Sequence, residues 1–274
     1  YDNTTGGYNV AVGQSALYNN ETADNNIAVG YVSLNANTTG ASNVAIGKDA
    51  LKANTTASGN VAIGCRSLDS NTTGSTNTAI GGGTMRATTT QTENTAVGST
   101  ALNGNTGNCN TGIGASALEN VTGDSNTAVG RRALYLNTSG TENVAVGSGA
   151  LDSNTTAGCN TSIGHGSMGD NTEGANNAAV GRNALGSNTT GASNVAVGRN
   201  SLTLNTTAIG NTATGAFALD KNTTGANNVG VGWQALTANT TASGNVAVGA
   251  LAGLAITTGH SQTALGFCAL TTAT

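Results

Sequence analysis

The chain of 274 residues contains no proline, and charged and aromatic residues make up only 8% and 3% of it. Without proline, no backbone N–H is missing from a ladder of strands. The scarcity of charge argues against disorder, because disordered chains carry charge and lack regularly placed β-branched residues. No apolar run approaches the roughly 20 residues of a membrane span, and the net charge of −4 includes no basic tract. We therefore expect neither nucleic-acid binding nor membrane insertion.

Cysteine and acidic residues are also few, which limits metal and redox chemistry. The four cysteines show no C-x-x-C spacing, so a zinc or redox site is not expected. No calcium-binding repeat occurs, and the acidic residues are too few for serial metal sites. We predict no cofactor and no metal site.

A 17-residue repeat runs through the whole chain. It contains an N-x-A-V-G-like pentapeptide, whose glycine we number as position 0 of each coil. The spacing is 17 residues throughout, except for two consecutive steps of 16 around Gly114. A fixed short period is typical of a solenoid. The glycine recurs at Gly13, Gly30, Gly47, Gly64, Gly81, Gly98, Gly114, Gly130, Gly147, Gly164, Gly181, Gly198, Gly215, Gly232, Gly249 and Gly266.

Two apolar segments and a turn make up each repeat. Positions −3 and −1 are mostly Val, Ile or Thr, position −2 is always Ala, Gly or Ser, and position −4 is almost always Asn. This alternation predicts a short strand. Position +3 is small and position +4 is Leu or Met, which indicates a second short strand. N-T-T-G or N-T-T-A follows, and its Asn and Gly favour a turn with left-handed backbone. We predict an all-β parallel β-solenoid of about sixteen coils with two short strands each.

Stacked coils would pair each strand with its copies above and below, in register. Val would stack on Val and Leu on Leu, and we expect the side chains at −1 and +4 to be buried in every coil. An asparagine ladder would hydrogen-bond coil to coil through side-chain amides. The two 16-residue steps are expected to be absorbed in turns near Asn108 and Asn120. Sixteen coils at about 4.8 Å give a rod of roughly 75 Å.

The small residues at −2 bear on assembly, because alternate residues of a strand face opposite sides. Either positions −3 and −1 line the interior and −2 faces outward, or −2 lies in a tight lumen and the Val and Ile rows face outward. An outer small-residue row favours close approach by a neighbouring chain, and an outer Val/Ile row is an apolar stripe that soluble monomers rarely expose. Both alternatives predict that the chain associates with itself along the coils.

The repeats also resemble those of known fibre proteins. Asn43-Val44-Ala45-Ile46-Gly47 and Asn60-Val61-Ala62-Ile63-Gly64 resemble the head repeats of YadA-like trimeric autotransporter adhesins, although the coil here is longer. With N-T-T-G included, the unit is similar to repeats of phage and large-virus tail-fibre or surface-fibre proteins. The resemblance implies a trimer of left-handed β-rolls on a cell or virion surface, outside the cell, which serves as an adhesive or spacer fibre.

We expect residues 1–274 to form a single solenoid domain. The chain opens at Tyr1 in mid-repeat, so a piece of a longer fibre is expected. Residues 249–274 are atypical terminal coils, because Gly249 is followed by neither the Leu at +4 nor the turn Asn. Three functions remain open: a trimeric shaft or head of a fibre with a host glycan or receptor as partner, a self-assembling filament without a receptor, and a monomeric ice- or glycan-binding solenoid.

One side-chain constellation could bind a ligand. His165, Arg182 and Arg199 occupy position +1 in three successive coils, with Arg131 two coils earlier. Stacking would place them in one column that suits an anionic glycan or a carboxylate; the alternative is scattered, solvated charge. Catalysis would depend on His165 or His260, and we expect no enzyme and no catalytic residues.

The Asn-Thr-Thr turns allow a further interpretation, because they form N-x-[ST] sequons that a host could glycosylate. The alternative is turn chemistry alone, since glycans on adjacent coils would crowd at a spacing of about 4.8 Å. These sequons begin at Asn3, Asn20, Asn37, Asn54, Asn71, Asn120, Asn137, Asn154, Asn188, Asn205, Asn222 and Asn239.

Overall fold

The computed structural model describes residues 3–271, and within them the regular secondary structure consists of sixteen three-residue strands. The chain forms two compact units, residues 1–132 and 133–274. The first unit contains β1 (Val10–Val12), β2 (Ile27–Val29), β3 (Val44–Ile46), β4 (Val61–Ile63), β5 (Thr78–Ile80), β6 (Thr95–Val97), β7 (Thr111–Ile113) and β8 (Thr127–Val129). The second contains β9 (Val144–Val146), β10 (Thr161–Ile163), β11 (Ala178–Val180), β12 (Val195–Val197), β13 (Thr212–Thr214), β14 (Val229–Val231), β15 (Val246–Val248) and β16 (Thr263–Leu265).

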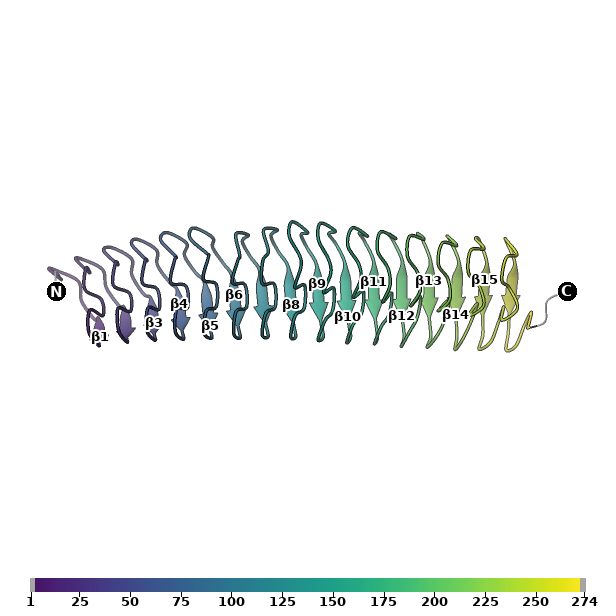
Figure 1. The fold of residues 1–274 in the computed structure, drawn as a ribbon, viewed down its shortest axis with the longest axis horizontal. Coiled ribbons are helices and arrows are strands. Elements are labelled where there is room, and N and C mark those ends of the chain that lie inside the picture. The colour runs from purple at the N-terminus through teal and green to yellow at the C-terminus, as the bar shows by residue number, and fades with distance from the viewer. Residues whose placement is uncertain (1–2, 272–274) are drawn as a thin grey trace. The chain divides into compact units, whose positions relative to one another are not determined.

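Within each unit the strands stack in chain order, parallel and in register (Figure 1). Each residue pairs with the one at the same repeat position in the next coil, as Val44 with Val61 and Ala45 with Ala62. The pairing holds through the 16-residue step, where Thr95 pairs with Thr111. The predicted all-β parallel solenoid is therefore confirmed, and within each unit every coil presents the same face of its strand to the same side.

The second predicted strand is wrong, because positions +1 to +6 form a continuous turn. Its residues at +2 and +4 have left-handed backbone, as Asp49 (φ 57°) and Leu51 (φ 48°) show. With these dihedrals the N–H groups at +2 and +4 point in opposite directions along the stack. The N–H of Asp49 donates to the preceding coil at Tyr31 O (2.9 Å), and that of Leu51 to the following coil at Ser67 O (3.0 Å). The turn thus keeps coil-to-coil hydrogen bonding without strand geometry.

The left-handed residues also lie elsewhere than expected. Besides +2 and +4 they occupy position −5 and the glycine at 0, whereas Asn54 and Ala57 of the N-T-T-A turn have ordinary backbone. Position 0 admits only glycine: Gly64 has φ +133°, and a Cβ there would fall on the carbonyl oxygen of Gly81. The glycine that marks the repeat is required because successive coils approach backbone to backbone at this point.

The interior of each coil holds the residues at −2, +3 and +4. Ala45, Ala50 and Leu51 are fully buried, whereas Ile46 at −1 is 38% exposed. The prediction that +4 is buried is confirmed, and the prediction that −1 is buried is wrong. The reason is space: at Gly112, in the −2 row, an added Cβ would lie only 3.1 Å from Leu102 Cδ1. A lumen this narrow accepts small residues at −2 and leaves the larger β-branched rows outside.

Two buried asparagines close most coils. Asn54 at +7 donates from Nδ2 to Asn37 Oδ1 in the preceding coil (2.9 Å) and to Ala57 O (3.0 Å). Asn43 at −4 donates from Nδ2 to the same Ala57 carbonyl (2.9 Å), and its N–H donates to Asn26 Oδ1 (2.9 Å). The carbonyl at +10 therefore joins the start of a coil to its end, 14 residues later. The expected asparagine ladder is present, and a second one accompanies it.

The two coils shortened to 16 residues keep this closure, and the atypical coil after Gly249 loses it, because Asn245 Nδ2 there is buried without a hydrogen-bond partner. The two 16-residue steps lose one residue from the turn after position +7, at residues 105–107 and 121–123, close to the sites expected. Gly107 then supplies the carbonyl that accepts Asn94 Nδ2 at 3.1 Å. In the atypical coil after Gly249, Ile256 replaces the turn Asn. Its Cδ1 lies 3.2 Å from the place of a Cβ on Gly253, so it fills the space that Leu occupies elsewhere.

We predict that Gly64→Ala destabilises the protein by several kcal/mol, since its Cβ would collide with backbone that cannot move aside. Gly59→Ala is the matched control: Gly59 also has positive φ (+70°), but its Cβ would meet only Thr76 Cγ2 at 3.6 Å. Residues other than glycine stand at the same position in other coils, such as Ser42. Chemical denaturation of both variants checks this, and equal loss of stability in the two would contradict it.

We also predict that Thr88→Asn stabilises the protein by about 1 kcal/mol, the usual net value of a hydrogen bond. Thr88 interrupts the +7 ladder and leaves Asn71 Oδ1 buried without a hydrogen-bond partner. A new Nδ2 at this position would reach Asn71 Oδ1 and the carbonyl of Gln91. Thr90→Asn, at an exposed site nearby, is the control and should leave the melting temperature unchanged. A Thr88→Asn protein no more stable than this control would contradict the ladder account.

Candidate functional site

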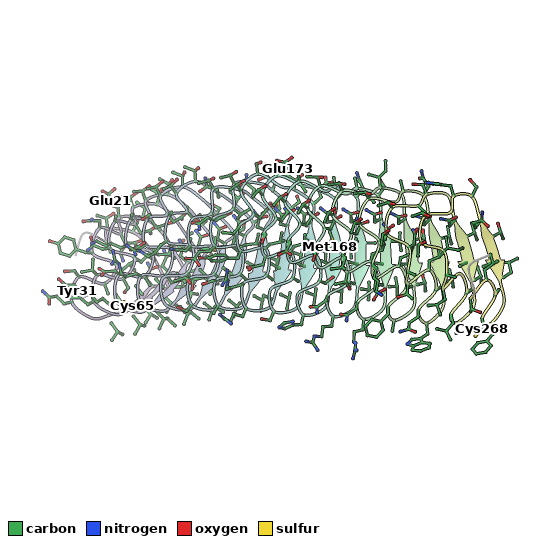
Figure 2. The ribbon with its side chains drawn as sticks, turned by 45° about the vertical axis from the view of Figure 1, so that its right-hand side comes forward. Glu21, Tyr31, Cys65, Met168, Glu173 and Cys268 are labelled. Atoms are coloured by element: carbon green, nitrogen blue, oxygen red, sulfur yellow. The ribbon has the colours of Figure 1, made fainter. Side chains whose placement is uncertain are left out.

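The repeat presents three surfaces in each unit. The outer sheet face consists of positions −3 and −1. The glycine edge consists of the turn positions +1 and +2, and the threonine edge of positions +8 and +9. Figure 2 shows the two edges on opposite sides of the coils, with Glu21 opposite Tyr31 and Cys65 in the first unit and Glu173 opposite Cys268 in the second. Function must come from these surfaces, because the lumen is filled.

The outer sheet face forms a largely apolar surface on each unit. Its side chains are Val, Ile and Thr in nearly every coil, and they are half-buried or exposed although they lie on a continuous sheet. Ile113 in the first unit and Ile163 in the second are each 39% exposed. Of the two alternatives left open by the sequence, the structure selects the outer Val/Ile row. This face carries no charged residue in any strand.

The predicted cationic column lies on the glycine edge of the second unit. His165, Arg182 and Arg199 are exposed and occupy the same turn position in successive coils. Backbone hydrogen bonds hold this edge in register: Asn183 N donates to His165 O (3.1 Å) and Asn200 N to Arg182 O (3.0 Å). The structure thus brings these three residues into one row.

Arg131, the fourth residue of the predicted column, belongs to the first unit. It follows β8 and Gly130 on the glycine edge of that unit, and its side chain is exposed. The row formed by His165, Arg182 and Arg199 therefore belongs to the second unit alone.

The row continues into aromatic residues that the sequence analysis did not connect with it. Phe217 follows Arg199 at position +2 of the next coil, and its N–H donates to Arg199 O (3.0 Å). The Arg199 guanidinium lies over the Phe217 ring, 4.8 Å from its centroid. Trp233, one coil further on, is 49% exposed. The amino-acid sequence contains this signal, because the arginines and aromatic residues follow one another when positions +1 and +2 are treated as one edge.

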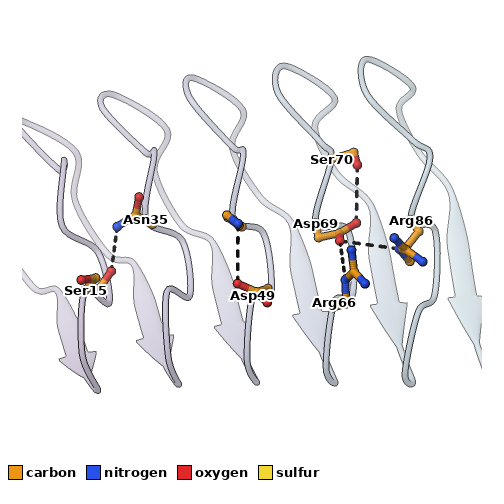
Figure 3. A network of polar contacts seen from close by, with 8 residues as sticks. Ser15, Asn35, Asp49, Arg66, Asp69, Ser70 and Arg86 are labelled. Carbon is orange, nitrogen blue, oxygen red and sulfur yellow. Dashed lines mark hydrogen bonds and ion pairs between the residues drawn. The ribbon is translucent and has the colours of Figure 1, made fainter.

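Arg66 and Arg86 form ion pairs on the turn, which distinguishes them from Arg182 and Arg199. In the first unit Asp69 lies between two arginines, 3.1 Å from Arg66 Nε and 3.6 Å from Arg86 Nε (Figure 3). The Asp69 side chain is only 11% exposed. These contacts are structural, since they tie neighbouring coils together. Within residues 3–271, neither Arg182 nor Arg199 forms an ion pair.

The sequon asparagines are structural rather than modification sites. Ten of the twelve are fully buried, where they form the +7 ladder, and only Asn3 and Asn120 are exposed. A glycan on the Nδ2 atom of Asn54 would have to displace the hydrogen bonds to Asn37 and Ala57. The turn interpretation of Asn-Thr-Thr is therefore the one that fits the folded protein.

Some hydroxyls of the threonine edge form hydrogen bonds between stacked coils. The hydroxyl of Thr55, at +8, donates to Thr72 O in the next coil at 3.2 Å. Hydroxyls used in this way are not available as a regular external array, which an ice-binding surface would need.

All four cysteines are free thiols. Cys159 Sγ lies 3.4 Å from Glu142 Oε2, one coil earlier at the same repeat position. This hydrogen bond, with smaller contributions from partial desolvation and the carboxylate charge, raises the pKa of the Cys159 thiol. Glu93 raises the pKa of Cys109 in the same way, with Asp124 adding to the effect. A raised pKa lowers the thiolate fraction at neutral pH and makes both cysteines poorer nucleophiles.

Residues 3–271 include no group of three or more His, Cys, Asp and Glu side chains placed to hold a metal ion. None of these residues forms a helix long and apolar enough to cross a bilayer. No protein-family model matches the chain, and no curated protein matches it either.

Proposed function

We propose that this domain is the shaft or head of a trimeric, extracellular fibre with a structural or adhesive role on a cell or virion surface. The observation that carries the proposal is the outer sheet face, which is uncharged in every strand and has Val, Ile or Leu at position −1 in every strand except β13. The resemblance of the repeats to autotransporter heads and tail fibres supports the number of chains and the location. The domain has no catalytic role in this proposal.

The outer sheet face has the properties of a surface that another chain covers. Val, Ile and Thr side chains on a regular sheet form an apolar stripe, and large exposed patches of this kind mark interaction sites. The strands pair in register, so neighbouring strands offer matching side chains, as Val44 and Ile46 repeat at Val61 and Ile63. A neighbour with the same repeat can therefore match it coil for coil.

Symmetry favours identical chains as the partners. A surface that repeats along the coils is complementary to a parallel copy of itself at every step, and closed cyclic assembly buries the stripe of each chain once. An end-to-end filament without a receptor is the second candidate. It is favoured by the regular stacking within each unit, since a further coil would find the same backbone donors and acceptors.

The oligomeric mass of the full chain tests the proposal. We expect size-exclusion chromatography with light scattering to give three times the chain mass of 26.5 kDa. The triple variant Ile46→Lys/Ile80→Lys/Ile113→Lys places charges on three exposed positions of the outer sheet face. It should dissociate to a folded monomer, because burying three ammonium groups without partners is strongly unfavourable.

The matched control is Thr39→Lys/Thr73→Lys/Thr106→Lys, which adds the same charge to exposed positions of the threonine edge and should remain a trimer. A monodisperse wild-type monomer at micromolar concentration would overturn the proposal. Masses that grow with concentration would favour the filament. If both triple variants dissociated equally, charge rather than the outer sheet face would be responsible, and the assigned interface would be wrong.

A further inference from the structure

We propose that the glycine edge of the second unit binds an acidic glycan, with Arg182 and Arg199 taking the carboxylate of one sugar and Phe217 and Trp233 packing against the next. The proposal deepens the adhesive role proposed above by naming the site and the class of ligand. We call these four residues the cation–aromatic strip.

The strip offers two arginines that form no ion pair within residues 3–271. Arg182 and Arg199 lie one coil apart at the same position, held by the bond from Asn200 N to Arg182 O. The acidic residues of the second unit lie elsewhere in the repeat, and positions +1 and +2 of residues 148–268 include none. A guanidinium presents a planar fork of donors that matches a carboxylate. Two unpaired forks at a spacing of about 4.8 Å make a site for an anion.

Arg199 is held ready for such a ligand by its contact with Phe217. Its guanidinium lies over the ring, 4.8 Å from the centroid. Stacking uses the face of the guanidinium and leaves the N–H groups in its plane free to donate. Fixing a long side chain before binding reduces the conformational entropy lost on binding.

Phe217 occupies its position at an energetic disadvantage. Its backbone is left-handed (φ 60°), a conformation that is unfavourable for a bulky residue. The four preceding coils have Gly149, Gly166, Asn183 and Asn200 at this position, which tolerate it readily, whereas Val32, Thr100 and Leu251 adopt it elsewhere. The Phe217 side chain is only half-buried, so part of its surface is available to a ligand.

Trp233 extends the strip beyond Phe217 into the next coil. Its indole is half-exposed, and the bond from Leu251 N to Trp233 O (2.8 Å) fixes its backbone. Trp combines a large apolar face with a polar N–H, a combination enriched at binding surfaces. The C–H face of a pyranose packs on such a ring, while a neighbouring sugar carboxylate reaches the arginines.

The charge of the chain favours a glycan over a nucleic acid. Arginines and aromatic rings also bind single-stranded nucleic acids, but those proteins present a broad positive groove along the backbone. This chain has a net charge of −4, and the strip has two arginines. A ligand with an occasional carboxylate between neutral sugar rings suits it better than a phosphate at every step.

Binding can be measured on the full chain by calorimetry with defined probes. These are an oligomer of galacturonic acid, its fully methyl-esterified form, sialyllactose and lactose. We expect one or both acidic probes to bind and their neutral counterparts not to bind. Comparing the galacturonic acid oligomer with sialyllactose shows whether the strip recognises a uronate or a sialate. Arg199→Ser and Trp233→Ala should each weaken binding about tenfold or more, as the loss of a charged hydrogen bond or a central aromatic contact does.

Arg86→Ser is the matched control, because it removes an arginine of similar exposure that is already paired with Asp69. It should leave binding unchanged. The proposal is overturned by no binding of either acidic probe at about 1 mM, by equal weakening in Arg86→Ser, or by tighter binding of a thymidine oligonucleotide. The mass of each sample is measured in parallel. If the protein is a trimer but binds no acidic glycan, the glycan-binding proposal alone is refuted. If it is a monomer that binds an acidic glycan, the trimer proposal alone is refuted.

Discussion

The convergence of two asparagine side chains on one carbonyl is the interaction on which this structure depends. In a 17-residue coil the residues at −4 and +10 must meet, and no strand pairing joins them. The Nδ2 atoms of Asn43 and Asn54 both reach Ala57 O, while their Oδ1 atoms accept from the next coil, at Asn60 N and Asn71 Nδ2. The same side chains therefore close each coil and attach it to its neighbour. Buried polar groups of this kind stabilise a fold only when they are fully paired.

This closure determines which residues face outward. It draws the coil tight around Leu51, so that the −2 row can hold nothing larger than Ala or Ser and the β-branched rows lie outside. The outer sheet face and its apolar character are thus a consequence of the narrow lumen. The left-handed turn at +1 to +6 has a similar consequence, since it projects Arg182, Arg199 and Trp233 from one edge at the spacing of the coils. Assembly and ligand binding, as proposed, use surfaces that the core geometry creates.

Most of the fold could be predicted from the repeat period, because a 17-residue spacing of Gly, Leu and Asn is explained most simply by stacked coils. The second strand was predicted wrongly, since an alternation of small and apolar residues looks alike in a strand and in a turn with alternating left-handed backbone. The orientation of Ile46 could not be settled from alternation alone. Among site residues, the row of His165, Arg182 and Arg199 follows from register, whereas the contact of Arg199 with Phe217 depends on a side-chain direction that spacing does not specify.

Replacing one ladder asparagine by its isosteric acid tests the central role of the ladders most directly. Asn54→Asp keeps the shape but removes the Nδ2 donor and places a charge beside Asn37 Oδ1 and Ala57 O. Asn120→Asp makes the same change at an exposed site. We predict that denaturation at pH 7 shows a loss of several kcal/mol for Asn54→Asp and a change within about 0.5 kcal/mol for Asn120→Asp. Equal stability of the two variants would contradict the account.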